Sequence, residues 1–149
     1  MREITTIVVH CLATIEGEYY DINDVDKMHK KRGFRCVGYH KLILLDGSVQ
    51  NGRPLHQIGA HVKGKNEDTI GVAYVGGLDQ NGSPKDTRTS AQKKSLKTEL
   101  KKLKNQFRNA KIKGHRDLSP DRNGNGKIER FEWLKACPCF DAIKEYKNL

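Results

Sequence analysis

The sequence predicts an α/β fold, a single domain in which helices flank a mixed central β-sheet. Its length of 149 residues fits one domain. Two β-branched apolar runs, Ile4–Cys11 and Thr69–Val75, lack a helical period and are typical of strands buried on both faces. Segments with the helical spacing of apolar residues alternate with these runs, and such alternation indicates a sheet covered by helices.

After the first strand, the sequence predicts a helix and then a hairpin. Apolar residues at three-residue spacing predict a helix over Asp21–Arg32, which Gly33 would end. A second strand is expected over Val37–Leu45. The dipeptide Asp46-Gly47 is typical of a tight turn, so we expect a short hairpin partner at residues 48–51.

The middle of the chain is expected to contain a long loop and two further strands. Residues 54–68 carry little periodicity, which indicates a loop before the strand at Thr69–Val75. Gly76-Gly77 would end that strand. Residues 110–113 are expected to form another strand, and the chain from residue 130 onward is expected to be helical in pieces that break around Pro138.

The clearest helix is expected to begin at Thr89. Thr89 and Gln92 have the spacing of a capping box. The buried stripe of this helix would consist of Leu96, Leu100, Leu103 and Phe107. Its outer face carries six lysines: Lys93, Lys94, Lys97, Lys101, Lys102 and Lys104. This face is either an ordinary solvated surface or a surface that attracts anionic polymers of the cell wall.

The charge balance points to anionic partners. Lys and Arg number 28 against 18 Asp and Glu, which gives a net charge of +10. Such a charge suits nucleic acid, a membrane surface or an anionic wall polymer. Aromatic residues make up only 7% of the chain and no nucleic-acid-binding motif is present, so we expect no specific nucleic-acid partner.

The chain carries no sequence signal for membrane insertion or secretion. It lacks an apolar window of about 18 residues, and its first residues lack the apolar core of a signal peptide. We therefore expect a monomer made in the cytoplasm, without membrane insertion. Four cysteines in such a protein are expected to be reduced thiols or metal ligands.

Three residues that can bind a metal lie at the ends of predicted elements: His10, His115 and Cys137. Two imidazoles and one thiolate suit zinc, and three protein ligands leave a fourth position for water. Spacing alone also fits ordinary structural histidines. Cys11 follows His10 in a strand and points to the opposite face, so only one of the two can reach the metal, and Cys11 is expected to be buried.

Several short blocks, in order from residue 4 to residue 141, resemble the type 2 N-acetylmuramoyl-L-alanine amidases, a family that includes phage lysozyme-type amidases and animal peptidoglycan recognition proteins. The blocks are Val9-His10-Cys11-Leu12-Ala13-Thr14, Gly38-Tyr39-His40, Asp46-Gly47, Gly52-Arg53, Gly59-Ala60-His61-Val62-Lys63-Gly64, Ile70-Gly71-Val72 with Gly76-Gly77, Gly114-His115, and Lys135-Ala136-Cys137-Pro138 with Phe140-Asp141. The resemblance implies the peptidoglycan recognition protein-like fold and a Zn²⁺ cofactor.

The resemblance also implies roles for individual residues. The zinc ligands would be His10, His115 and Cys137. Tyr39 would lie near the zinc-bound water or the substrate carbonyl, where it could transfer a proton or hold the nucleophile by a hydrogen bond. Lys135 would stabilise the oxyanion. His61 matches a substrate-binding histidine at the rim of the family's cleft. Cys139 is either a competing ligand or a passive thiol.

The function implied by the resemblance is hydrolysis of the amide between N-acetylmuramic acid and L-alanine in peptidoglycan. A catalytic domain of this kind without a signal peptide resembles a phage or prophage endolysin, which acts on the cell wall after release. The alternative is a non-catalytic module that binds peptidoglycan. The zinc ligands of such a module would normally be broken, and here they are intact.

A departure from the smaller phage enzymes lies between His115 and Cys137, which are separated by 21 residues. The insertion at 121–132 matches the twelve-residue calcium-loop template, with Gly126 at position six. The expected Ca²⁺ ligands are Asp121, Asn123, Asn125, Lys127 through its carbonyl, Glu129 and Glu132. The alternative is an ordinary polar turn. Pro120 makes a regular entering helix unexpected.

Overall fold

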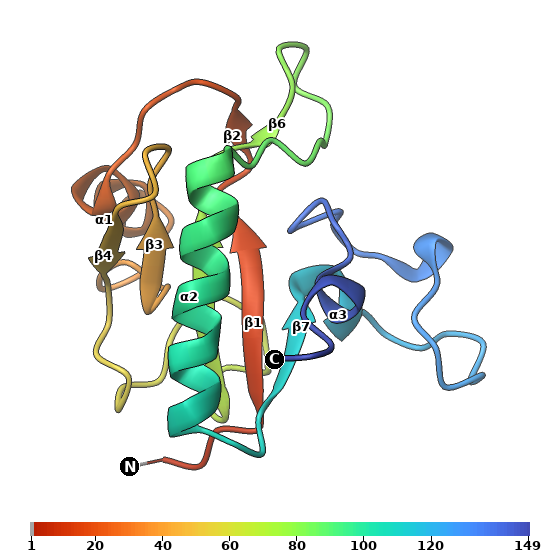
Figure 1. Cartoon of the computed structure of the whole chain (residues 1–149). Coiled ribbons are helices and arrows are strands. Elements are labelled where there is room, and N and C mark those ends of the chain that lie inside the picture. Colours follow the sequence, from red (N-terminus) through yellow and green to blue (C-terminus); the bar gives the residue numbers. More distant parts are fainter. Residues whose placement is uncertain (1) are drawn as a thin grey trace.

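The computed structural model describes residues 2–149 and contains a five-stranded sheet in the order β4-β3-β5-β1-β7 (Figure 1). Neighbouring strands run parallel except for β4, which pairs antiparallel with β3. The mixed sheet is therefore confirmed. The strands span Thr6–Cys11 (β1), Lys41–Ile43 (β3), Val49–Asn51 (β4), Thr69–Tyr74 (β5) and Lys111–Gly114 (β7).

The two long helices begin where their caps predict. In α1 (Ile22–Lys31), the Asp21 side chain accepts from the backbone N–H of Asp24, and the Asp24 side chain accepts from that of Asp21. Thr89 and Gln92 form the same reciprocal pair at the start of α2 (Ser90–Gln106). Each box satisfies backbone donors that the first turn of a helix leaves free. A third, short helix, α3, spans Ala142–Glu145.

The two faces of the sheet pack against different helices. Leu96 and Leu100 of α2 pack in one apolar cluster with Val9 of β1. Val25 of α1 packs with Ala73 of β5 in the other cluster. Because side chains alternate along a strand, His10 points to the face opposite Val9. His10 pairs in register with Ala73, so it lies on the α1 side of the sheet.

Two features differ from the sequence prediction. The expected strand at 37–45 is shortened to β3, because residues before it pair with other partners: Gly38 N donates to the His29 ring and Gly38 O accepts from Ala60 N. The second difference is a pair of short strands that the sequence did not predict, although β5 itself ends at Tyr74, just before Gly76-Gly77, as expected. Gly77 begins β6 (Gly77–Leu78), which pairs parallel with β2 (Thr14–Ile15).

The C-terminal segment lies beside β7 and is helical in pieces, as predicted (Figure 1). Short 3₁₀ helices span His115–Leu118 and Arg130–Glu132. The buried Arg88 side chain, just before α2, pairs with Asp86 at 2.9 Å and Glu145 at 2.6 Å. Its guanidinium also lies 3.4 Å from the Phe140 ring centroid. Arg88 thus ties the C-terminal segment to the start of α2.

Candidate metal centre

The structure brings together the three residues that the sequence singled out as metal ligands. One ligand atom each from His10, His115 and Cys137 lies within 4.8 Å of the other two. Within residues 2–149 no other group of three His, Cys, Asp or Glu side chains meets this criterion. His10 lies near the end of β1, and His115 directly follows β7, its parallel neighbour. Parallel pairing therefore brings the two imidazoles to the same edge of the sheet.

The hydrogen bonds of His10 assign its two ring nitrogens. Its Nε2 lies 2.8 Å from Nδ1 of His61. Its Nδ1 lies 3.8 Å from the Sγ of Cys137 and faces the candidate centre. Burial, with the nearby charges of His61, His115 and Lys135, holds the pKa of His10 well below its usual value. Burial and Lys135 lower the pKa of His115 to about 4. Both rings are therefore neutral at pH 7, the form that can bind a metal.

Cys137 is held by two backbone hydrogen bonds, and Pro138, the residue after it, packs against β7. The backbone N–H of Arg116 donates to the Cys137 carbonyl at 2.8 Å, and the N–H of Cys11 donates to its Sγ at 3.1 Å. Pro138 packs on Gly114, where an added Cβ would lie 2.6 Å from the Pro138 Cδ. Position 114 requires glycine because any side chain there would collide with the Pro138 ring. The C-terminal segment is thereby fixed against the ends of β1 and β7.

Tyr39 and Lys135 both lie near this group. The Tyr39 ring centroid lies 5.1 Å from that of His10. Burial, with the nearby Cys137 and Cys11, raises the pKa of Tyr39, so its hydroxyl stays protonated and can donate. Lys135 is exposed, and its charge contributes to the lowered pKa of both His10 and His115. The arrangement thus offers a hydroxyl donor and a solvent-facing cation beside the candidate ligands.

His61 is partly buried, and its ring contacts that of His10, with 4.9 Å between the two ring centroids. Besides His10, the ring approaches the Thr69 hydroxyl, with 3.2 Å between Nε2 and Oγ1. Its substrate-binding role stays a prediction.

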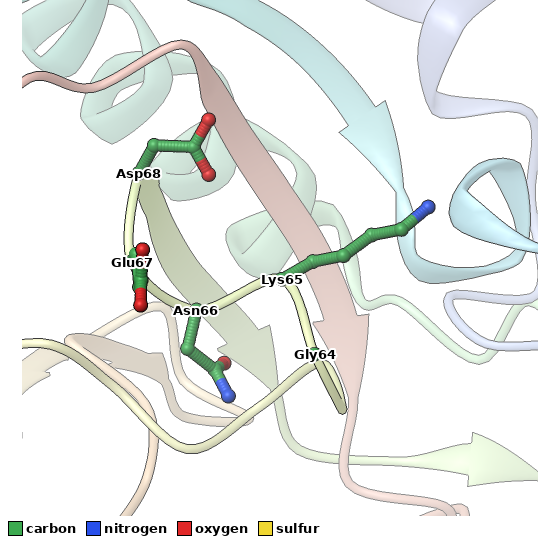
Figure 2. A pocket seen from close by; sticks show the side chains of 5 residues that line it. All are labelled: Gly64, Lys65, Asn66, Glu67 and Asp68. Atoms are coloured by element: carbon green, nitrogen blue, oxygen red, sulfur yellow. The ribbon is translucent and has the colours of Figure 1, made fainter.

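The adjacent loop over residues 64–68 lines a depression of about 430 Å³ (Figure 2). None of the predicted site residues lines that depression. Asn66 in the loop accepts the backbone N–H of His61 at 3.0 Å, and Lys65 reaches across to donate to the Leu118 carbonyl at 3.0 Å.

The two remaining cysteines of this region lie beside each other, outside the ligand group. Cys11 is buried on the α2 face, as expected for a strand residue next to His10. Its Sγ lies 3.9 Å from that of Cys139, whose thiol donates to the Gly77 carbonyl at 3.4 Å. A hydrogen bond with Cys137, together with burial, raises the pKa of Cys11 to about 12. This geometry favours Cys139 as a passive thiol.

The loop at residues 121–132 is organised by carboxylates that accept backbone hydrogen bonds. Asp121 accepts from Gly124 N at 3.0 Å and from Gly126 N at 2.8 Å. The buried Glu132 accepts from the backbone N–H groups of Arg122 and Glu129. The side-chain amides of Asn123 and Asn125 donate to Glu129. Calcium binding stays a prediction of the sequence template.

Comparison with known proteins shows the family to which the chain belongs. The family model described as N-acetylmuramoyl-L-alanine amidase matches residues 1–129. The chain belongs to this amidase family. The match ends before Cys137, which the fold places beside His10 and His115.

Individual relatives agree with this assignment. The endolysin of Klebsiella phage KP32 is 37% identical over 140 residues, which cover 94% of this chain and 83% of that protein. The solved structure of the N-acetylmuramoyl-L-alanine amidase LysC from Clostridium intestinale is 25% identical, with a TM-score of 0.71 over 97% of this chain and 82% of LysC. Bumblebee PGRP-SA shares the fold with a TM-score of 0.73 at 18% identity, over 99% of this chain and 83% of its own.

Three residues of β5 that the sequence did not assign to the site lie around the centre: Thr69, Gly71 and Tyr74. They contact His61 or the peptide after Cys137. The sequence indicated that these residues belong to a strand, but not which strand lies beside it.

No helix among residues 2–149 is long and apolar enough to span a bilayer.

Proposed function

We propose that this amidase-family chain is a zinc-dependent peptidoglycan hydrolase that cleaves the amide between N-acetylmuramic acid and L-alanine. It would act as a phage or prophage endolysin on the cell wall after release. The observation that carries the proposal is the intact group of His10, His115 and Cys137. The endolysin of phage KP32, which is similar over 94% of this chain, supports the biological role.

The donor set fits zinc. Zinc accepts imidazole nitrogen at about 2.0 Å and thiolate sulfur at about 2.3 Å in a tetrahedral arrangement. Ligand atoms of such a site lie roughly 3.5 Å apart. The separation of 3.8 Å between His10 Nδ1 and Cys137 Sγ agrees with this spacing. Three protein ligands leave one position open, which is the pattern of a catalytic site.

In the proposed mechanism, the protein residues orient the reacting groups and stabilise charge. Zinc, when bound, supplies Lewis-acid polarisation and a water acidic enough to attack at neutral pH. The Tyr39 hydroxyl, held protonated by its surroundings, donates a hydrogen bond to the nucleophile or the substrate carbonyl. The Lys135 ammonium stabilises the negative charge on the carbonyl oxygen of the substrate. The exposure of Lys135 lets it meet a substrate that arrives from solvent.

The alternative is a module that binds peptidoglycan without cleaving it, on the same fold. The complete donor set favours hydrolysis, because a binding module has no need for three metal ligands with an open position. The accompanying cation Lys135 favours it as well. A direct assay for new amino termini separates the two functions.

The test is incubation of purified peptidoglycan sacculi with the full chain, with and without a zinc chelator, followed by identification of the new amino termini. We expect L-alanine termini that are absent with chelator and absent for Cys137→Ser. The matched control is Cys139→Ser, which should keep both zinc and activity because that thiol lies outside the ligand group. Binding of sacculi without new termini would favour the binding module. Zinc retained by Cys137→Ser would contradict the ligand assignment.

A further inference from the structure

His61 connects the candidate ligand His10 to the backbone of the loop before β5 through a continuous series of hydrogen bonds. His10 Nε2 lies 2.8 Å from His61 Nδ1. The other ring nitrogen of His61 lies 3.2 Å from Thr69 Oγ1. The Thr69 hydroxyl donates to the Lys65 carbonyl at 2.8 Å. Each member of this series is at hydrogen-bonding distance from the next, and the series ends at a backbone group that can only accept.

The direction of these hydrogen bonds follows from the number of protons available. The Thr69 hydroxyl has one proton, which it donates to Lys65, so its oxygen is left to accept from His61 Nε2–H. A neutral His61 that carries its proton on Nε2 has a free lone pair on Nδ1. His10 must therefore donate from Nε2, and its own lone pair is on Nδ1, the atom that faces Cys137. The Lys65 carbonyl thus selects the metal-binding tautomer of His10.

A glycine of β5 provides the space in which the His61 ring lies. A Cβ on Gly71 would lie 2.7 Å from Cγ and 2.8 Å from Nδ1 of His61. Real Cβ atoms do not approach a ring that closely, so the ring is in direct contact with the sheet at this position. His61 is accordingly fixed by packing of its ring against Gly71 and by hydrogen bonds at both ring nitrogens.

We propose that His61 is a positioning residue of the metal centre, which holds His10 in the rotamer and tautomer that present Nδ1 to zinc. Metal-bound histidines commonly donate their second N–H to a partner that fixes the ring, and loss of such a partner weakens metal binding. The inference rests on the proposed zinc site. It gives His61 a different role from the substrate contact implied by the family resemblance.

The experiment measures zinc affinity of the full chain by competition with a chromophoric chelator, and the visible spectrum of the Co²⁺-substituted protein. His61→Phe keeps a ring of similar size without the acceptor and should weaken zinc binding by about 10- to 100-fold. Thr69→Val should weaken it in the same direction, whereas Thr69→Ser, which keeps the hydroxyl, should retain wild-type affinity. Both weakened variants should show an altered cobalt spectrum. Leu103→Ala, at a buried position of α2 in the core, controls for loss of stability and should keep zinc affinity.

Kinetics with a soluble muropeptide distinguish the two roles of His61. A positioning residue lowers kcat in zinc-saturated protein and leaves KM nearly unchanged, whereas a substrate contact raises KM at unaltered zinc affinity. Wild-type zinc affinity and cobalt spectrum in both His61→Phe and Thr69→Val would overturn the inference. If His61→Phe does not fold, the comparison of Thr69→Val with Thr69→Ser tests the inference by itself. A wild-type chain that binds no zinc would contradict the proposed function itself.

Discussion

The hydroxyl of Tyr74, at the end of β5, donates a 2.6 Å hydrogen bond to the carbonyl of Pro138, the residue after Cys137. Tyr74 is fully buried, and it belongs to the central sheet rather than to the C-terminal segment. A residue in the middle of the fold thereby holds the third candidate ligand, which comes from the last part of the chain. The same strand supports His10 through His61.

Tyr74→Phe is expected to weaken zinc binding without removing a ligand. The substitution leaves the buried Pro138 carbonyl without its partner, which should lower the free energy of unfolding by about 1–2 kcal/mol. Cys137 would then be held less firmly, and zinc affinity should fall several-fold. Chelator competition and thermal denaturation measure the two effects. Tyr19→Phe, at an exposed tyrosine, is the control. Unchanged zinc affinity in Tyr74→Phe would show that the bond serves stability alone.

Lys135→Ala and Tyr39→Phe are expected to keep zinc and lose turnover. Neither side chain belongs to the ligand group, so metal content should match that of wild type. Removal of a group that stabilises the transition state should lower kcat by about 100-fold or more. Metal analysis and muropeptide kinetics on the same preparations provide the measurement. Near-normal rates for both variants would refute their catalytic role.

Charge reversal on the outer face of α2 should weaken binding to sacculi without affecting chemistry. Lys94, Lys97 and Lys101 are exposed on the helix that covers the sheet face opposite His10. Their replacement by Glu should reduce sacculus binding and its dependence on salt, while turnover of a soluble muropeptide stays the same. The same reversal at Lys31, Lys144 and Lys147 controls for net charge. Equal effects of the two triple variants would indicate that no particular face binds the wall.

The predicted calcium loop can be tested by adding the ion. If residues 121–132 bind Ca²⁺, wild type should show calorimetric heat and a higher melting temperature, with Kd of roughly 10⁻⁵ to 10⁻³ M because two ligands are neutral Asn. The double variant Asp121→Ala with Glu132→Gln should show neither effect. Each protein is compared with and without calcium at constant zinc, since Glu132 also supports the loop backbone. No heat and no stabilisation at millimolar calcium would identify the loop as an ordinary polar turn.

The ion pairs of Arg88 should make part of the stability sensitive to acid. Hydrogen bonding to Arg88 lowers the pKa of Glu145 below 4.5. Burial alone would raise the pKa of Asp86, but bonding to Arg88 outweighs it and lowers the value below 3.8. A carboxyl with a lowered pKa in the folded chain stabilises the fold above its unfolded pKa, and this stabilisation is lost as the pH falls.

Arg88→Met should therefore be less stable than wild type at pH 7, by about 1–3 kcal/mol given that both carboxylates are partly exposed. The difference in unfolding free energy between the two proteins should shrink between about pH 5 and pH 3. Denaturant unfolding across this range is the measurement. A difference that stays constant with pH would assign the effect of Arg88 to its packing on Phe140.

The sequence by itself determined most of the elements and the candidate ligands. Thr89 with Gln92 predicted the start of α2, because a capping box is a local pattern of side chain and backbone. The alternation of side chains along a strand predicted that His10 and Cys11 point to opposite faces of the sheet, because this rule needs no knowledge of the neighbouring strands. The suitability of His10, His115 and Cys137 as zinc ligands likewise followed from their residue types alone.

Only the tertiary structure decided how these residues are held. The neighbours of a strand depend on pairing between distant segments, which no local pattern specifies, so the place of β5 beside β1 was not predicted. The pairing of β2 with β6 was missed for the same reason. The supports of the candidate centre all follow from such pairing: Gly71 under the His61 ring, Thr69 at its far nitrogen, and Tyr74 on the Pro138 carbonyl.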